Sequence, residues 1–308
     1  MVEPRVAILM CTFYGERFLQ EQLDSIAAQT HQNWVLWVSD DGSTDQTLAL
    51  LRATQAQWGE DKLKIVEGPR LGFARNFLYL ACHPDIEADY YAFSDQDDIW
   101  LSEKLSRAIG LLEHQKRELP SLYGSRTELI NAHGKTIGIS KLIPHDLRFH
   151  NALVQNVAGG NTMVFNHALR DIVRFAGPDM DIVSHDWWLY IVTTAMRGKV
   201  VFDQNPFIQY RQHKGNLVGS NTSISAKLNR LSQLFSGRFK GWIQRNHTCL
   251  LRINTKMSDD YANIEESLAS LHRFSLLQRI NCFKKIGVRR QSLGGTCALF
   301  LAVVFNQV

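Results

Sequence analysis

The sequence predicts an α/β fold built on an open, mostly parallel sheet, and two observations support this prediction. Short runs of consecutive apolar residues alternate with longer segments in which apolar residues recur at helical spacing. Two of the runs end directly in clusters of aspartates, at residues 39–45 and 94–98. Strands that alternate with helices form a parallel sheet with right-handed crossovers.

The first half of the chain contains four such strand and helix pairs. The first strand is expected at residues 6–11, and Phe18, Leu23 and Ile26 mark the helix after it. Ser43 and Gln46 have the spacing of a capping box, and Ser102 has the place of an N-cap. The other strands are expected at residues 34–38, 63–66 and 90–93, and the other helices at 47–58, 72–82 and 102–119.

The pattern loosens after residue 119. A turn is expected at His133-Gly134, and Ser184 opens a helix at residues 187–197. Short strands are expected at 162–165, 200–202 and 207–210. We expect residues 1–220 to form a catalytic domain and residues 221–308 a basic, amphipathic, helical C-terminal extension.

Composition and charge exclude several classes of protein. With 308 residues, 45% of them hydrophobic, the chain can bury a large core. Five widely spaced cysteines suggest neither a disulfide framework nor a zinc cluster, and no secretory signal is seen, so a cytoplasmic location is expected. Residues 221–308 carry 13 lysines and arginines against 4 acidic residues, a net charge of +9, which leaves −5 for residues 1–220.

The extension is expected to lie on a membrane surface rather than on nucleic acid. Its apolar residues at helical spacing are Leu228, Leu231, Leu234 and Phe235, with Lys227, Arg230, Arg238 and Lys240 around them. The apolar run at 296–305 is shorter than the about 20 residues that span a bilayer, so it is expected as an interfacial or core helix. These features predict peripheral association with the inner face of the cytoplasmic membrane.

Polar side chains should meet at one edge of the sheet. Ligands of open α/β sheets bind beyond the carboxyl ends of the strands, where Thr12, Asp40, Asp41, Asp95 and Asp97 are expected to share a crevice. Neither G-x-G-x-x-G nor a P-loop is present, so a nucleotide's phosphates would need a cation or arginines. From the residues alone, the stretch SDQDDIW at 94–100 is either an acidic turn or a metal site.

An ordered set of motifs resembles the family 2 glycosyltransferases of the GT-A fold, and in part the bacterial rhamnosyltransferases of polysaccharide and O-antigen assembly. The resemblance covers about residues 5–215. The motifs are TFYGE at 12–16, SDDGSTD at 39–45, LGFARN at 71–76, SDQDDIW at 94–100, GGNTMVFN at 159–166, HDWWL at 185–189 and YRQH at 210–213. The resemblance implies a GT-A-like nucleotide-diphospho-sugar transferase fold, in which a Rossmann-like, mostly parallel sheet is flanked by helices.

The resemblance also implies a role for each motif. A divalent cation, Mg²⁺ or Mn²⁺, would be held by Asp97, with Asp95 and His213 as further candidates. A solvated turn for the aspartates and a structural role for a lone histidine are the alternatives. The residues implied to bind the nucleotide sugar are Thr12, Tyr14, Glu16, Asp40, Asp41, Arg75 and Asp95.

Asp186 is the candidate general base, which would take the proton of the acceptor hydroxyl. An acidic residue in a first helical turn is also favoured by the helix dipole alone. His185 departs from the family pattern, in which an acidic residue often precedes this aspartate. The candidates for the acceptor side are Gly160, Asn161, Trp187 and Trp188, although tryptophans at a helix start are more often core residues.

We therefore expect a metal-dependent, inverting glycosyltransferase. Its donor would be dTDP-L-rhamnose, and its acceptor a saccharide, free or lipid-linked, in bacterial surface polysaccharide synthesis. One rival is a sugar-phosphate nucleotidyltransferase, which would need a phosphate loop rich in glycine and arginine after the first strand. The other rival is a non-catalytic carbohydrate-binding or scaffold protein with the same fold.

Overall fold

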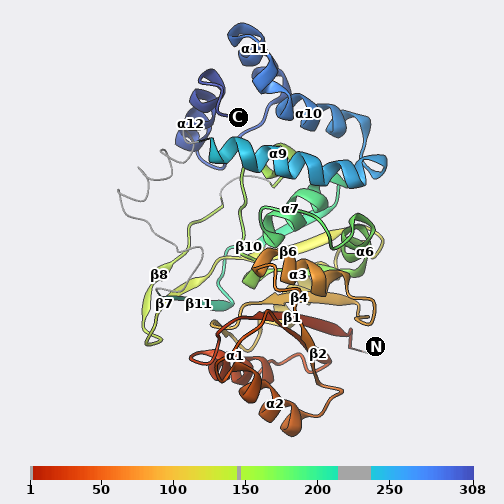
Figure 1. The fold of residues 1–308 in the computed structure, drawn as a ribbon, viewed down its shortest axis with the longest axis vertical. Coiled ribbons are helices and arrows are strands. Elements are labelled where there is room, and N and C mark those ends of the chain that lie inside the picture. Colours follow the sequence, from red (N-terminus) through yellow and green to blue (C-terminus); the bar gives the residue numbers. More distant parts are fainter. Residues whose placement is uncertain (1–2, 144–146, 214–236) are drawn as a thin grey trace.

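A computed structural model describes residues 3–143, 147–213 and 237–308. At its centre lies a seven-stranded sheet (Figure 1). In spatial order its strands are β10 (Lys199–Asp203), β6 (Ser121–Ser125), β9 (Val164–Asn166), β4 (Tyr90–Ser94), β1 (Val6–Thr12), β2 (Trp34–Asp40) and β3 (Leu63–Glu67). β9 runs antiparallel to β4 and β6, and the other pairs are parallel. The mostly parallel α/β sheet predicted from the sequence is confirmed.

Helices cover both faces of this sheet because successive residues of a strand point to opposite sides. Val6, Ile8 and Met10 of β1 belong to one buried core, whereas Ala7 and Leu9 belong to the other. The first core is closed by α1 (Leu19–Ala27), α2 (Thr47–Trp58) and α4 (Lys104–Leu112), and the second by α3 (Phe73–Cys82), α6 (His167–Ala176) and α7 (His185–Ala195).

A second, four-stranded sheet follows the acidic stretch and was not predicted. Its order is β5 (Ile99–Trp100), β11 (Ile208–Gln212), β7 (Glu128–Asn131) and β8 (Thr136–Ile139). β5 directly follows residues 95–98 and pairs with β11, which ends one residue before His213. The small sheet thereby brings His213 next to the acidic stretch.

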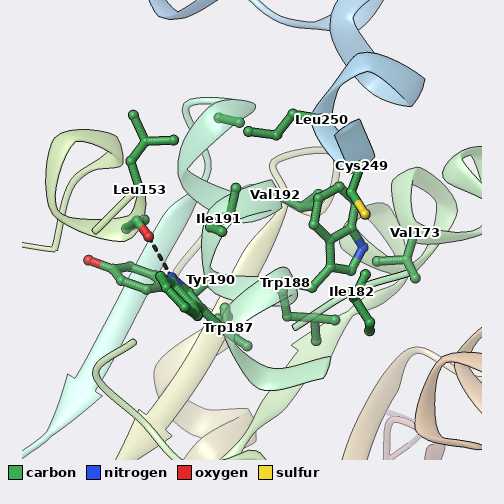
Figure 2. Packing of buried hydrophobic residues seen from close by; sticks show 14 of the residues in the cluster. Leu153, Val173, Ile182, Trp187, Trp188, Tyr190, Ile191, Val192, Cys249 and Leu250 are labelled. Carbon is green, nitrogen blue, oxygen red and sulfur yellow. Dashed lines mark hydrogen bonds between the residues drawn. The ribbon is translucent and has the colours of Figure 1, made fainter. Parts of the chain in front are cut away.

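Four helices at the C-terminal end lie over α7. They are α9 (Arg238–Leu250), α10 (Asp259–Ala269), α11 (Leu276–Ile286) and α12 (Leu293–Val304). Cys249 and Leu250 of α9 share one apolar cluster with Trp188 and Val192 of α7 (Figure 2). The short elements are α5 (Phe149–Ala152) and the 3-10 turns η1 (Gly160–Thr162), η2 (Leu251–Lys256) and η3 (Leu271–Arg273).

Several predictions for the extension concern residues outside the described ranges. These are the amphipathic helix around Leu228, Leu231, Leu234 and Phe235, and the domain boundary after residue 220. The apolar run predicted at 296–305 belongs to α12. Within the described ranges, no helix combines the length and the apolar character needed to cross a bilayer.

Two helix starts differ from the prediction. Ser43 and Gln46 form no capping box, because the Ser43 hydroxyl donates to the buried carboxylate of Asp40. Asp45 takes the place of Ser43 at the start of this helix, because its side chain accepts a hydrogen bond from the Thr47 backbone N–H at 3.1 Å. The helix predicted at 102–119 is the shorter α4, which follows Glu103 rather than Ser102.

Candidate active site

The carboxyl ends of β1 and β2 form a compact turn around Asp40. This buried carboxylate accepts hydrogen bonds from the hydroxyls of Thr12 and Ser43 at 2.8 and 2.6 Å. It also accepts from the backbone N–H groups of Gly42 and Ser43 at 3.1 and 2.7 Å. With these four bonds, Asp40 and Thr12 stabilise the turn that carries Asp41.

Asp41 connects this turn to the loop before α3. Its two carboxylate oxygens accept from the backbone N–H groups of Arg70 at 2.6 Å and Gly72 at 2.9 Å. Arg70 has a positive φ of 59°, which is unusual for a residue other than glycine. Asp41 therefore fixes the start of α3, the helix on which Arg75 is half-buried.

The loop after β1 presents two half-exposed aromatic rings. Phe13 and Tyr14 meet edge to face with ring centroids 4.4 Å apart. Tyr14 also has a positive φ of 52°, and its backbone N–H donates to the Ser43 hydroxyl at 2.9 Å. Glu16 accepts from the Gln46 backbone N–H at 2.9 Å, so it stabilises the start of α2. The rings offer an apolar surface beside Asp40 and Asp41.

Residues 95–98 form a loop that is fixed from three sides. The Gln96 side chain both accepts from and donates to the backbone of Phe13, at 2.9 and 3.0 Å. The fully buried Asp98 accepts from the Asn161 side chain at 2.6 Å and from the Arg211 backbone N–H at 3.0 Å. The Arg211 guanidinium donates to the carbonyl oxygen of Asp97 at 2.9 Å.

The pair Asp97 and His213 is the best candidate for holding a cation. The Asp97 Oδ2 and His213 Nε2 atoms are 2.7 Å apart, and both side chains are partly exposed. Within the described ranges, no three His, Cys, Asp or Glu side chains converge on one point. One carboxylate and one imidazole, completed by substrate phosphates, is nonetheless a donor set that suits Mg²⁺ or Mn²⁺.

Asp95 links the acidic loop to Asp186. Burial raises the pKa of Asp95 to about 7, and the negative charges of Asp97 and Asp186 add to this effect. Asp186, in the first turn of α7, is therefore near enough to Asp95 for its charge to act on this pKa. Asp186 Oδ1 accepts from the Trp187 backbone N–H at 2.7 Å. The structure thus brings together two motifs that lie about ninety residues apart in the sequence.

Two buried cations support the acidic loop and were missed in the sequence. Lys104 is fully buried with its Nζ 3.5 Å from the Trp100 ring centroid, and burial lowers its pKa to about 7. Arg211 lies over the Phe18 ring at 4.5 Å and forms an ion pair with Glu21 at 2.6 Å. Arg211 stands in the YRQH motif, which was the available signal, whereas no pattern distinguishes Lys104 from a surface lysine.

The residues predicted for the acceptor side lie inside the protein. Trp187 and Trp188 are core residues under α9, and the Trp187 indole N–H donates to the Ala152 carbonyl (Figure 2). Asn161 is buried and supports Asp98, and Gly160 packs against the buried ring of His185. These positions correct the expectation of sugar stacking, because neither indole is accessible.

Comparisons of the sequence with known protein families and proteins find the same family that the motifs resemble. A model described as Glycosyl transferase family 2 matches residues 7–172. The dTDP-rhamnosyl transferase RfbG of Shigella flexneri is 31% identical over 228 residues, which cover 72% of this chain and 78% of the relative. The UDP-Glc:alpha-D-GlcNAc-diphosphoundecaprenol beta-1,3-glucosyltransferase WfgD of Escherichia coli is 27% identical over 61% of this chain and 69% of its own.

Solved structures share the fold at low sequence identity. TarS 1-349 of S. aureus, in complex with UDP-GlcNAc, superposes with a TM-score of 0.59 at 14% identity. The match covers 92% of this chain and 80% of the TarS chain. The mannosyltransferase PcManGT of Pyrobaculum calidifontis, in complex with GDP-Man and Mn²⁺, superposes with a TM-score of 0.52 at 17% identity. The match covers 100% of this chain and 85% of the mannosyltransferase chain. The GT-A fold implied by the motifs is thereby confirmed.

Proposed function

The chain belongs to glycosyl transferase family 2, and we propose that it is a metal-dependent, inverting enzyme that transfers L-rhamnose from dTDP-L-rhamnose to a saccharide. One observation carries the mechanism: the negative charge of Asp186 adds to the raised pKa of the buried Asp95, which lies in the same loop as Asp97, the partner of His213. A leaving-group site and a candidate base then face the same space.

On the donor side, the turn built by Asp40 and Asp41 receives the nucleoside. The half-exposed rings of Phe13 and Tyr14 provide a stacking surface for its base. Arg75, half-buried on α3, is assigned to the diphosphate, because the guanidinium fork suits phosphate oxygens. Asp97 and His213 would hold the cation, which when bound neutralises charge on the departing nucleoside diphosphate.

On the acceptor side, Asp186 takes the proton of the attacking hydroxyl. Its Oδ1 accepts a hydrogen bond from the Trp187 backbone N–H at 2.7 Å, which orients the carboxylate in the first turn of α7. A single displacement by one base, without a covalent partner, inverts the anomeric centre. Positioned proton transfer of this kind contributes about 10²- to 10⁴-fold in rate.

Rhamnose is proposed from the relative that acts as a dTDP-rhamnosyl transferase, at 31% identity. A lipid-linked saccharide is proposed as acceptor, since the relative WfgD is named for a diphosphoundecaprenol-linked substrate. An enzyme with such an acceptor works at the cytoplasmic face of the membrane, in the synthesis of a surface polysaccharide such as O-antigen. The extension from residue 221 onward is proposed to hold it there.

Hydrolysis of nucleotide sugars tests this function, because water can stand in for the acceptor. We expect release of dTDP from dTDP-L-rhamnose in the presence of Mn²⁺, and weaker release from UDP-glucose or GDP-mannose. Asp186→Asn should lower turnover at least about a hundredfold with little change in donor binding. The matched control is Asp179→Asn, at an exposed aspartate that precedes α7 in the chain. Equal turnover in both variants would remove Asp186 from the mechanism.

A further inference from the structure

The last helix, α12, is apolar on both of its faces. It contains no charged residue, and Leu299, Ala302 and Val303 pack into the core. On the opposite face Leu293, Leu301 and Phe305 are 86, 47 and 61% exposed, and Cys297 between them is exposed as well. A spacing of four residues turns the helix by about 40°, so these four side chains form one continuous arc of about 120°.

This exposed arc belongs to a well-anchored helix. The Ser292 hydroxyl accepts from the Gly295 backbone N–H at 3.1 Å at its start. At its end, the buried Arg279 of α11 donates to the Val303 carbonyl at 3.0 Å. The rings of Phe283 and Phe300 hold α11 and α12 together, with centroids 6.0 Å apart. The apolar arc is therefore a fixed surface rather than a frayed chain end.

The charge of the last part of the chain indicates which kind of partner fits the arc. Residues 267–308 contain six lysines and arginines and no acidic residue. Lys284 and Lys285 are exposed in the last turn of α11, and Arg289 is exposed in the loop that leads into α12. A second copy of this chain would bring the same positive charge against itself, whereas anionic lipid headgroups are complementary to it.

We propose that the outer face of α12, formed by Leu293, Cys297, Leu301 and Phe305, lies in the interface of an anionic membrane, with the neighbouring lysines and Arg289 on the headgroups. A helix of 12 residues is too short to cross a hydrocarbon core of about 30 Å, so it lies parallel to the surface. The proposal rests on the proposed function only for its choice of membrane, the one that carries a lipid-linked acceptor.

Sedimentation with vesicles tests the proposal on the full chain. We expect binding to phosphatidylcholine vesicles that contain phosphatidylglycerol, and a loss of binding as salt is raised. The double substitution Leu293→Ser and Leu301→Ser should weaken the partition at least about tenfold. The matched control replaces Ile137 and Ile139, two half-exposed apolar residues of β8, with serine and should bind like wild type.

Three results would overturn the proposal. The first is an unchanged partition of the α12 double variant, and the second is equal binding to purely phosphatidylcholine vesicles. The third is a soluble dimer that the same variant converts to a monomer, which would assign the arc to a second copy. Donor hydrolysis is measured on the same samples and should be unchanged in the α12 variant. Absent hydrolysis in wild type would count against the proposed function and leave the lipid result standing.

Discussion

Replacing His185 with leucine tests how the start of the catalytic helix is built. The imidazole is buried, stacked on the Phe77 ring with centroids 4.0 Å apart, and in edge contact with Phe93 at 4.8 Å. Neither of its ring nitrogens has a hydrogen-bond partner within the described residues. Burial lowers the pKa of His185 to about 4, against the opposing effect of Asp186. Leucine has a similar volume and loses no hydrogen bond.

The pKa shift predicts a specific dependence of stability on pH. Between pH 6.5 and 4 the unfolded chain binds a proton at His185 that the folded chain does not bind, so folding stability falls as pH is lowered through this range. A shift from about 6.5 to about 4 corresponds to about 2 kcal/mol lost by pH 5 and about 3 kcal/mol in full. The leucine variant lacks this loss.

The assay is urea unfolding at pH 7 and at pH 5 for wild type, His185→Leu and the control His133→Gln in an exposed turn. We expect the difference in free energy of unfolding between wild type and His185→Leu to change by about 2 kcal/mol between the two pH values. The control should follow wild type at both. If all three proteins lose the same stability at pH 5, the ring is not held neutral by burial.

Three further predictions concern the same site. Gly160→Ala should destabilise the protein by about 1 to 3 kcal/mol in urea unfolding, since the added Cβ would overlap the His185 ring; an unchanged midpoint would contradict this packing. Arg211→Lys should lower the affinity for Mn²⁺ about tenfold in a calorimetric titration. The reason is that lysine lacks the guanidinium fork, which donates to Asp97, Glu21 and Ala132. An affinity equal to that of wild type would show that the loop at 95–98 does not depend on these hydrogen bonds. Chelation by EDTA should abolish donor hydrolysis. Added Mn²⁺ should restore hydrolysis in wild type but not in Asp97→Ala. Full activity in EDTA would exclude a role of the metal in the reaction.

The strands of the first half were predictable because they are buried on both faces. Such strands read as unbroken apolar runs, and β1, β2 and β4 appear within one or two residues of the expected ranges. The loop at 95–98 follows β4 at the carboxyl edge of the sheet as predicted, and its role in ligand binding stays a prediction. The two-residue strand β5 was missed, because its pairing with β11 depends on residues more than a hundred positions later.

Individual side-chain roles were less predictable, since they depend on tertiary contacts. Asp40 has the sequence pattern of a ligand-binding residue, but the turn around it uses both of its oxygens. Lys104 has the pattern of a solvated residue at a helix start, but α4 places it inside the protein. Trp187 and Trp188 are buried by α9, a helix that begins some fifty residues later.

That late cover has a consequence for how the chain is made. The apolar face of α7, which carries Asp186, is closed by Cys249 and Leu250 of α9 (Figure 2). Between the end of α7 at Ala195 and the end of α9 at Leu250, 55 residues must be added. At synthesis rates of about 5 to 20 residues per second this takes roughly 3 to 11 s. During that interval the nascent catalytic half lacks the cover that α9 later gives to Trp187 and Trp188.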